Sequence, residues 1–600
     1  MPVGDLVRAP LVLLLASLAL RAQNSTEKIR AEPSPTAARC GEAVHWCESL
    51  EDALKQASEQ HRDVFWYVPT LRGSPMDRKP EIDRYMLAGP FSWTATVRVL
   101  NERFVPVRGV PSREQAKQFH LERVTFIEPG FLVLRADGSE RARIDEITTY
   151  APSWFLDRFA EVLDPKDEVL AAARADVLRL EQDTEHRRGG MEGPRAEVDF
   201  VRGALRFWDG DEKAAHEIWN KLVADSPDDP WAWKAAAEVE GHGPLVNGFE
   251  VPWRPLAPGV AGVPTPRGTM APAGAFDLPA LRVAAIRYFA SQQRSDGGFV
   301  DSRYDFGGSD ALPNVWTADT ALAALAILEI APRLDNAERM RAESVLQKAF
   351  DYVQDDAHIA KTDRDEIVWA HLYRARLASR WLQLRPDDRT RVLPLLQRAV
   401  ADLVALQPQN GAWFHEYANP FVIGACLVAL DEARSVGVKV PDDPIDRGVL
   451  ALLRCRTKDG AISYGYSERG EARAQPQGGA GRMPLAELAL LRCGQGNGEA
   501  LQKAIAASFQ WHEELAKVRK YDDHASRFGY GGFFFWFDVH ARTEAILRME
   551  PGAQRDAWIK EQRTQILALP EFDGCFVDSH ELGRVYGTAM AQICLALLDR

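Results

Sequence analysis

Carboxylates, histidines and aromatic residues recur in the C-terminal half of the chain, close to the points where apolar segments begin. A carboxyl pair beside a histidine can move protons to and from a substrate. Aromatic rings beside a few charges form sites for small ligands and glycans. These types predict a ligand site, without an assigned catalytic residue, made by Asp301, Trp316, Asp319, His415, Tyr417, Trp536, His540, Asp578, His580, Arg584 and Tyr586.

A structural interpretation of the same residues stays open beside the functional one. Aspartate in front of a helix is a common N-cap, and arginine and aspartate on facing loops form salt bridges. Aromatic residues can pack the seams between helices. In GYGGFFFWFDVHARTEA, the five consecutive aromatic residues favour a site, although His540 can equally be a core histidine.

The elements that must position these residues are twelve predicted helices. Nearly the same octet occurs twice, as DGGFVDSR from Asp296 and DGCFVDSH from Asp573. Such distant repetition indicates a repeated supersecondary unit. Glycine in the turns suits a helix C-terminus. The predicted outer helices are 278–293, 337–355, 389–407, 445–456, 498–517 and 554–569, and the inner ones are 313–331, 366–385, 419–436, 481–493, 531–549 and 583–598.

The inner segments are apolar on nearly every side, as in ADTALAALAIL and GTAMAQICLALL. A helix without a polar stripe must be surrounded by protein. Six such helices inside six amphipathic ones predict a closed all-α (α/α)6 toroid over residues 278–600. In a closed ring the first and last pairs are neighbours, so the two octets meet and the candidate residues gather at one mouth.

The turn FASQQRSDGGF resembles the glutamine- and glycine-containing repeat of squalene–hopene cyclases. The C-terminal half therefore resembles the terpenoid cyclase and protein prenyltransferase toroids. The whole chain is similar to exported bacterial proteins with prenyltransferase/squalene-oxidase-type repeats, whose function is generally unassigned. This resemblance implies the toroid architecture and leaves the reaction open.

The chemistries of that fold can be tested one residue at a time. At the proton-donor position of the cyclases, WTADTA has Ala318, and Asp319 lacks its acidifying partners. For a prenyltransferase zinc site, FDGCF falls on a repeat turn, and Gly587 stands where a histidine is expected. Cys493 and Gln495 are two positions apart, one too few for a complement-type thioester. We therefore expect neither a squalene cyclase nor a prenyltransferase, with no cofactor and no metal.

The N-terminal half predicts a multidomain protein. Residues 40–165 have the order strand, helix, strand, hairpin and helix, and resemble the thioredoxin fold, with Pro129 before a hairpin strand. The loop PTLRGSPMDRKPE lacks the cysteine pair of that family, so the resemblance implies a redox-inactive module, because that chemistry needs a thiolate. Residues 168–245 resemble a short tetratricopeptide (TPR)-like connector. Residues 246–277 have the proline- and glycine-rich composition of a linker.

Residues 1–22 read as a secretory signal peptide, with an uncleaved anchor as the alternative. We expect no transmembrane segment beyond it and an exported protein, periplasmic or extracellular. In such a compartment Cys40 and Cys47 are candidates for a disulfide. The net charge of −13 excludes a nucleic-acid partner on electrostatic grounds.

Three functional hypotheses remain. The first is an exported binding or scaffold protein whose toroid mouth holds an unknown small ligand, glycan or protein, because the recognisable catalytic motifs are missing. The second is an enzyme acting on a terpenoid-like lipid, which needs a deep apolar cavity of several hundred Å³. The third is a glycan lyase or hydrolase, and hydrolysis needs two carboxyl groups beside aromatic rings.

Overall fold

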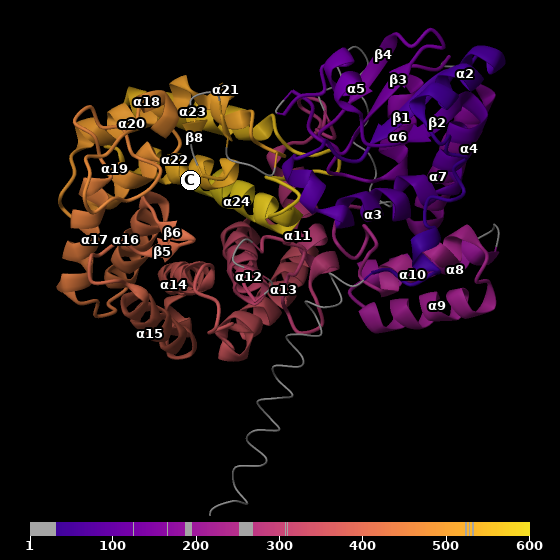
Figure 1. The fold of residues 1–600 in the computed structure, drawn as a ribbon. Helices are drawn as coiled ribbons and strands as arrows, with labels where there is room; N and C mark the ends of the chain where they lie inside the picture. Colours follow the sequence, from indigo (N-terminus) through magenta and orange to yellow (C-terminus); the bar gives the residue numbers. More distant parts are fainter. Residues whose placement is uncertain are drawn as a thin grey trace, which may run out of the picture.

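The computed structural model describes residues 32–599, apart from 124, 165, 186–194, 251–267, 306–307, 309, 522–524, 527–528 and 531–532. Figure 1 shows a helical ring in the C-terminal half, from magenta to yellow, beside a mixed N-terminal part in indigo and purple. The predicted signal peptide and most of the predicted linker lie outside the described residues.

The C-terminal half is a toroid of two concentric helical layers, as the apolar pattern predicts. Each inner helix contacts the next, and the last contacts the first, which closes the ring. The outer helices are α11 (Leu278–Gln292), α13 (Asn336–Gln354), α15 (Arg389–Leu406), α17 (Asp442–Arg454), α20 (Gly498–Gln510) and α23 (Ala553–Leu567). The inner helices are α12 (Leu312–Ile330), α14 (Ile367–Leu384), α16 (Pro420–Ser435), α19 (Met483–Arg492), α22 (Phe535–Arg548) and α24 (Gly583–Leu598).

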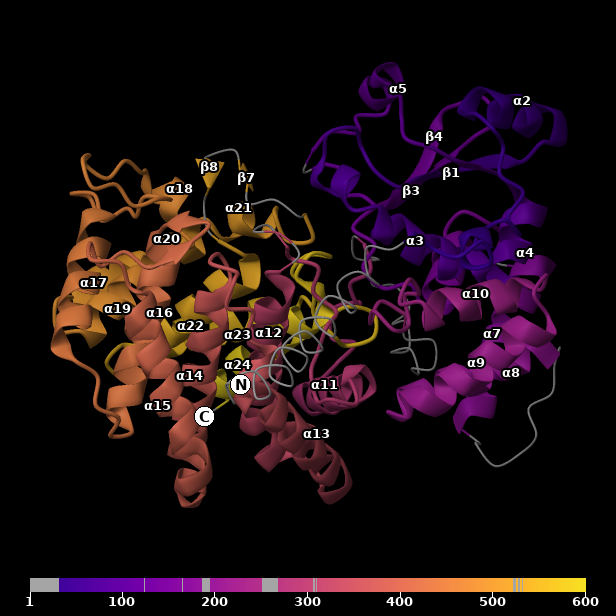
Figure 2. The ribbon, with the colours of Figure 1, turned by 60° about the horizontal axis from the view of Figure 1, so that its bottom comes forward.

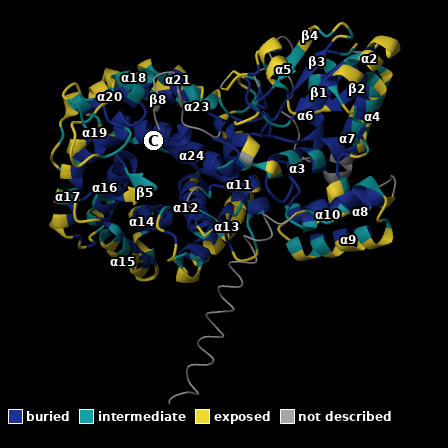
Figure 3. Ribbon diagram, in the orientation of Figure 1, coloured by how far each residue is buried: buried dark blue, intermediate teal, exposed yellow. Residues whose placement is uncertain are grey.

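Burial follows the two layers. In Figure 3 the inner helices are almost wholly buried, and exposed residues concentrate on the outer ones. The segment Leu312–Arg333, mainly α12, is long and apolar enough to cross a membrane, contrary to the expectation that no such segment follows the signal peptide. However, 94% of its apolar window is buried inside the protein. Its composition is that of the core of the ring.

The first octet contacts residues that closely follow the second one, where the ring closes. The carboxylate of Asp301, in the first octet, accepts hydrogen bonds from the backbone N–H groups of Arg584 at 2.7 Å and Val585 at 2.9 Å. Inside each octet the phenylalanine N–H donates to a threonine of the following inner helix, Phe299 to Thr320 and Phe576 to Thr588, both at 3.0 Å. The repetition therefore encodes two equivalent joints at the closure.

The glycine of the repeated turn is required by both backbone and space. Gly297 and Gly574 have φ values of +95° and +80°, in the left-handed region that favours glycine. A Cβ atom on Gly297 would lie 2.2 Å from the carbonyl oxygen of Lys348 on α13. The turn thus brings each outer helix against the next.

The N-terminal part contains a four-stranded sheet in the order β2-β1-β3-β4. Its strands are β1 (Asp63–Val68), β2 (Phe104–Arg108), β3 (Gly130–Leu134) and β4 (Glu140–Ile144), with β1 parallel to β2 and antiparallel to β3, and β3 antiparallel to β4. The helices around it are α2 (Leu50–Gln60), α3 (Pro80–Ala88), α4 (Thr94–Arg103), α5 (Arg113–Gln118) and α6 (Pro152–Ala160). The predicted order of elements is observed.

Two details of this part bear on the expectations from sequence. The peptide bond before Pro129 is cis. The disulfide proposed between Cys40 and Cys47 is absent, because both are free thiols, Cys40 buried and Cys47 half-buried. Cys40 packs instead against the connector, in an apolar cluster with Trp233 and Ala236.

The connector consists of α7 (Glu168–Glu185), α8 (Arg195–Trp208), α9 (Glu212–Asp225) and α10 (Pro230–Val239), which lie below the sheet module in Figure 2. The connector packs against the sheet module, as expected of a helical hairpin that cannot bury its apolar face alone. Trp93 of the sheet module packs edge-on against Trp231 of α10, with ring centroids 5.1 Å apart. The two parts share this small core.

The described ends of the predicted linker are packed into the protein. Glu250 is fully buried, and its carboxylate accepts from Lys234 at 2.7 Å and from the Trp93 indole at 2.8 Å. Phe249 stacks on Tyr85 and Tyr150 of the sheet module. Residues 246–250 therefore form part of a core, where the composition suggested a spacer.

Candidate functional site

The N-terminal ends of the inner helices surround a cavity of about 50 Å³. Two carboxyl groups and an imidazole face it, Asp319 from α12, Glu366 from the residue before α14, and His415 from the short strand β5 (Phe414–His415). The rest of the wall is aromatic or aliphatic, made by Tyr304, Val315, Ala318, Leu322, Trp369, Tyr373, Phe533, Phe534, Phe537, Leu582 and Tyr586.

Local structure explains how Glu366 comes to face this cavity. The side chain of Asp363 accepts from the backbone N–H groups of Asp365 at 2.8 Å and Glu366 at 3.1 Å. Asp363 thereby satisfies the open N–H groups at the start of α14, as an N-cap does. The Glu366 carboxyl, 1% exposed, is thus not needed as a cap and turns inward.

A tight hairpin positions His415. β5 pairs antiparallel with β6 (Tyr417–Ala418), and Glu416 between them has a φ of +58°. Successive residues of a strand point to opposite sides. His415 therefore points inward at 2% exposure, whereas Phe414 is 40% exposed on the outside.

Glu366 and His415 form a buried pair. The imidazole Nδ1 lies 3.2 Å from a Glu366 oxygen, and Nε2 lies 3.8 Å from Glu416. Burial works against a charged imidazole, but Glu366 and Glu416 outweigh it and raise the pKa of His415. Burial also raises the pKa of Glu366, which the imidazole partly offsets. Each member of the pair therefore favours the charged form of the other.

Asp319 is a different kind of acid. It is 3% exposed, and its Oδ2 has no hydrogen-bond partner among the described residues. Burial, and secondarily the charge of Asp301, raise its pKa well above the ordinary value. A carboxyl group with a raised pKa holds its proton to a higher pH than an ordinary aspartate and can donate it.

Three residues that line this cavity each carry a buried polar atom without a hydrogen bond among the described residues. Besides the Oδ2 of Asp319, the Oε1 of Glu366 and the Nε2 of His415 are buried and make no hydrogen bond within the described chain. A buried polar group left unpaired costs about 1–3 kcal/mol. Three such atoms around one cavity fit a site that is completed by a ligand or by water.

The structure brings together only some of the predicted site residues. Asp319, His415 and Tyr586 line the cavity, and Tyr417 is half-buried on the hairpin beside it. Two of the others cap helices, since Asp301 accepts from the start of α24 and Asp578 accepts from the N–H of Trp536 at 2.7 Å.

The indoles of Trp316 and Trp536 are also structural. They donate to the backbone carbonyls of Ser302 at 3.0 Å and Val577 at 3.1 Å. For these two residues and the two aspartate caps, the structural interpretation of the sequence holds.

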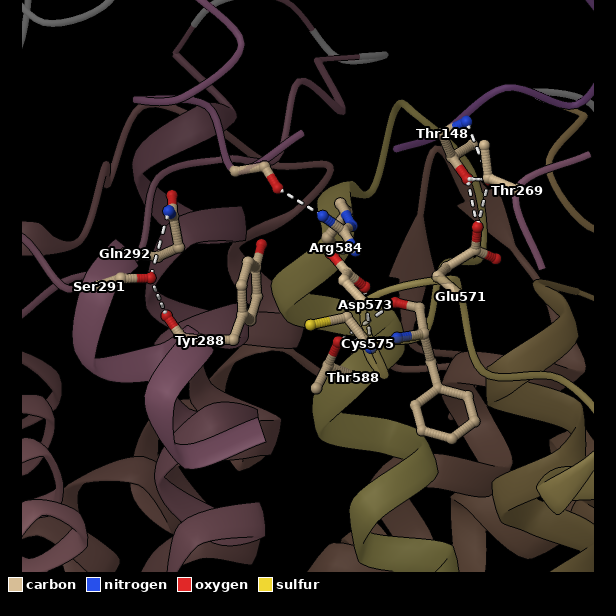
Figure 4. Close-up of polar contacts among 12 residues, drawn as sticks. Thr148, Thr269, Tyr288, Ser291, Gln292, Glu571, Asp573, Cys575, Arg584 and Thr588 are labelled. Atoms are coloured by element: carbon tan, nitrogen blue, oxygen red, sulfur yellow. Dashed lines mark hydrogen bonds and ion pairs between the residues drawn. The ribbon is translucent and has the colours of Figure 1, made fainter. Parts of the chain in front are cut away.

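Three more predicted mouth residues lie elsewhere. His540 lines a cavity at the opposite end of the ring, because it sits deeper along α22 than the mouth. His580 faces the sheet module, where its Nε2 lies 2.9 Å from the carbonyl oxygen of Ile147 and its ring stacks on Phe249. Arg584 donates to the Gly248 carbonyl at 2.8 Å and pairs with Asp573 (Figure 4).

Sequence reasoning missed Glu366, Trp369 and Phe533 as parts of the site. The only signal for Glu366 was the acidic run DRDE in front of an apolar helix, which is also typical of helix capping.

The structure also qualifies the expectation of no metal. One potential ligand atom each from Glu366, His415 and Glu416 lie within 4.8 Å of one another. Oxygen and imidazole donors suit several divalent cations.

Comparison with known proteins gives no family. No family model matches the chain, and no curated protein matches it. Among solved structures, the GH76A α-1,6-mannanase of Salegentibacter sp. HEL1_6 is 13% identical, with a TM-score of 0.37 over 54% of this chain and 100% of that one. Inactive variants of that enzyme, in complex with α-1,6-mannotetrose and α-1,6-mannotriose, are 12% identical with TM-scores of 0.37 and 0.36 over the same shares. These likenesses are too low to indicate function.

Proposed function

We propose that the toroid is a hydrolase of neutral glycans whose active site is the acid-lined cavity. The observation that supports this best is the convergence of Asp319, Glu366 and His415, each with an unpaired polar atom, on one aromatic-lined cavity. Burial raises the pKa of both carboxyl groups, that of Asp319 well above its ordinary value, and perturbed pKa values in one cavity are typical of acid–base sites.

In this mechanism Asp319 is the general acid and Glu366 the general base. Asp319 gives its proton to the glycosidic oxygen as the bond from the sugar carbon to that oxygen breaks. Water forms the new bond to the sugar carbon and gives its proton to Glu366. The charge of His415 favours the ionised form of Glu366. The products carry the added water, and Asp319 and Glu366 return to their starting states by exchanging protons with solvent.

The size of the cavity limits what can enter it. A cavity of about 50 Å³ exceeds the volume of about 10–15 Å³ that one water molecule needs, so it admits the attacking water and a small part of the substrate. The sugar rings would lie outside this cavity. A terpenoid chain needs several hundred Å³, which disfavours the lipid-enzyme hypothesis.

The charge of the wall favours a neutral substrate and hydrolysis. The ionisable side chains that line the cavity are carboxyl, phenol and imidazole groups, with no lysine or arginine among these described residues. A lyase acting on uronates needs a group that neutralises the sugar carboxylate. The scaffold hypothesis explains the packed interfaces but not three unpaired polar atoms in one cavity.

The test is a screen of the full-length protein against neutral oligosaccharides with different linkages, with products followed by mass spectrometry. We expect cleavage by the wild type, and a loss of at least about 100-fold, the usual contribution of one acid or base, in Asp319→Asn and in Glu366→Gln. Glu499→Gln, an exposed residue of α20, is the matched control. Cleavage of no neutral glycan, or full activity in both site variants, would contradict the proposal.

We also propose that the protein works outside the cytoplasm, on the basis of the signal sequence predicted in residues 1–22. Fractionation of the producing cells tests this. Recovery of the full-length chain in the cytoplasm alone would contradict it.

A further inference from the structure

A second cavity, of about 240 Å³, lies at the opposite end of the ring. All six inner helices contribute to it, through their C-terminal halves. On α12, Glu329 lines this cavity and Asp319 lines the first one. The two cavities share no lining residue, although Leu322 of the first and Leu325 of the second are only one helical turn apart.

One wall of this cavity is charged and tightly cross-linked. The guanidinium of Arg376 donates to Glu432 at 3.0 and 3.1 Å and also pairs with Glu544. Arg492 pairs with Asp431 at 3.2 Å. Two-point contacts between guanidinium and carboxylate hold both partners in a fixed geometry. The wall is therefore preorganised.

Two polar atoms in this wall remain unpaired. The Oε2 of Glu544 is buried and accepts no hydrogen bond among the described residues, and the Nε of Arg492 donates none. The Nδ1 of His540 lies 3.8 Å from that oxygen. Burial lowers the pKa of His540 to about 4, so it is neutral at pH 7. Burial disfavours an ionised Glu544, but Arg376 and His540 outweigh it and lower its pKa to about 2.

The Glu544 oxygen and the Arg492 nitrogen require hydrogen-bond partners of opposite kinds. The ionised oxygen of Glu544 needs a donor, and the N–H of Arg492 needs an acceptor. Arg548, exposed at the rim, adds a guanidinium that forms no ion pair within the described chain. The cavity thus offers an anion in its wall and cations beside it.

The other wall is apolar. It consists of Leu325, Leu547, Ile593 and Leu597, from α12, α22 and α24. Contact with these side chains favours a ligand with a hydrocarbon group. The volume is slightly below the range of about 300–1,000 Å³ for drug-sized ligands, which limits the ligand to a small metabolite.

We propose that this cavity binds a small zwitterion of amino-acid type with an apolar side chain. Its ammonium group lies at Glu544, its carboxylate at Arg492 and Arg548, and its side chain against the leucines. The site is independent of the proposed glycan hydrolysis, because none of these residues lines the first cavity.

Isothermal titration calorimetry of the full-length protein with L-leucine tests the proposal. Two probes separate the charged groups, since 4-methylpentanoic acid lacks the ammonium group and isopentylamine lacks the carboxylate. We expect saturable binding of leucine. Each probe should bind at least about tenfold more weakly, because each lacks one charge-assisted hydrogen bond. Equal affinity of either probe, or no leucine binding at about 10 mM, well above a weak Kd of about 1 mM, would overturn the proposal.

Variants locate the site. Arg548→Ala changes an exposed rim residue and should weaken leucine binding without altering the thermal transition. Glu544→Gln should abolish binding but also disturbs the pair with Arg376, so its folding is checked by circular dichroism. Asp319→Asn, in the other cavity, should bind leucine as the wild type does. Unchanged affinity in Arg548→Ala, or lost affinity in Asp319→Asn, would contradict this placement.

Discussion

Replacing Asp319 with leucine should stabilise the protein while removing its proposed activity. Asp319 is buried with one oxygen unpaired, and an unpaired buried polar group costs about 1–3 kcal/mol. Leucine removes that cost, and its extra volume can extend into the adjoining cavity of about 50 Å³. The free energy of unfolding should therefore rise by about 1–3 kcal/mol near pH 4, where the unfolded chain still holds the proton, and by more at pH 7, an uncommon result for a core substitution.

The pH dependence makes this prediction specific. The raised pKa means that the folded protein keeps the Asp319 proton, whereas the unfolded chain loses it above about pH 3.9. The folded state then binds one more proton. As pH rises between those two pKa values, the wild type loses about 1.4 kcal/mol of stability per pH unit from this group, and Asp319→Leu does not.

Differential scanning calorimetry at pH 5, 6, 7 and 8 measures both effects. The transition temperature of Asp319→Leu should exceed that of the wild type, by a margin that widens as pH rises. Asp319→Asn removes the titration but keeps a polar group, so it should lose the slope without the full stabilisation. A leucine variant that is less stable at pH 7, or a margin independent of pH, would refute a protonated and unpaired Asp319.

Three further predictions concern the rest of the molecule. Lys520 and Glu571 form a buried ion pair at 2.8 Å. Lys520→Met leaves the Glu571 carboxylate without its main partner, so the free energy of unfolding measured in urea should fall by about 3–5 kcal/mol. Removing both charges should recover most of that loss. Gly583→Ala, at a φ of +78° with its Cβ 2.6 Å from the carboxylate that caps α24, should lower the transition temperature; an unchanged temperature would contradict the tight closure. Cys40 and Cys47 should both be alkylated in unfolded protein without reductant, and in folded protein Cys47 should react first, since burial raises the pKa of Cys40 to about 12; a mass showing a disulfide would contradict this.

The ring was predictable because its signals are local and repeated. An inner helix such as α12 is apolar on every side, and the turn at Gly297 recurs along the chain. The order of elements in the sheet module was also readable, because strands and turns alternate there. How residues 246–250 pack was not, because proline- and glycine-rich composition gives no sign of the burial of Glu250.

The candidate site was only partly predictable, for two physical reasons. An acid before a helix has the same sequence pattern as a cap and as a catalytic group, and only the Asp363 cap shows that Glu366 is free of that task. Depth along a helix decides which end of the ring a residue reaches, and this separates His540 from Asp319. His580 and Arg584 contact residues outside the toroid, and the toroid sequence alone does not show where those residues pack.

Closure of the ring also sets an order on synthesis. α12 packs against α24, yet about 250 residues separate the end of one from the start of the other. At about 5–20 residues per second, a ribosome needs roughly 13–50 s to make the intervening chain. During that time the apolar helix α12 has left the ribosome without α24 to cover it. The nascent polypeptide must therefore be bound by chaperones, or stay incompletely folded, until the final segment is made.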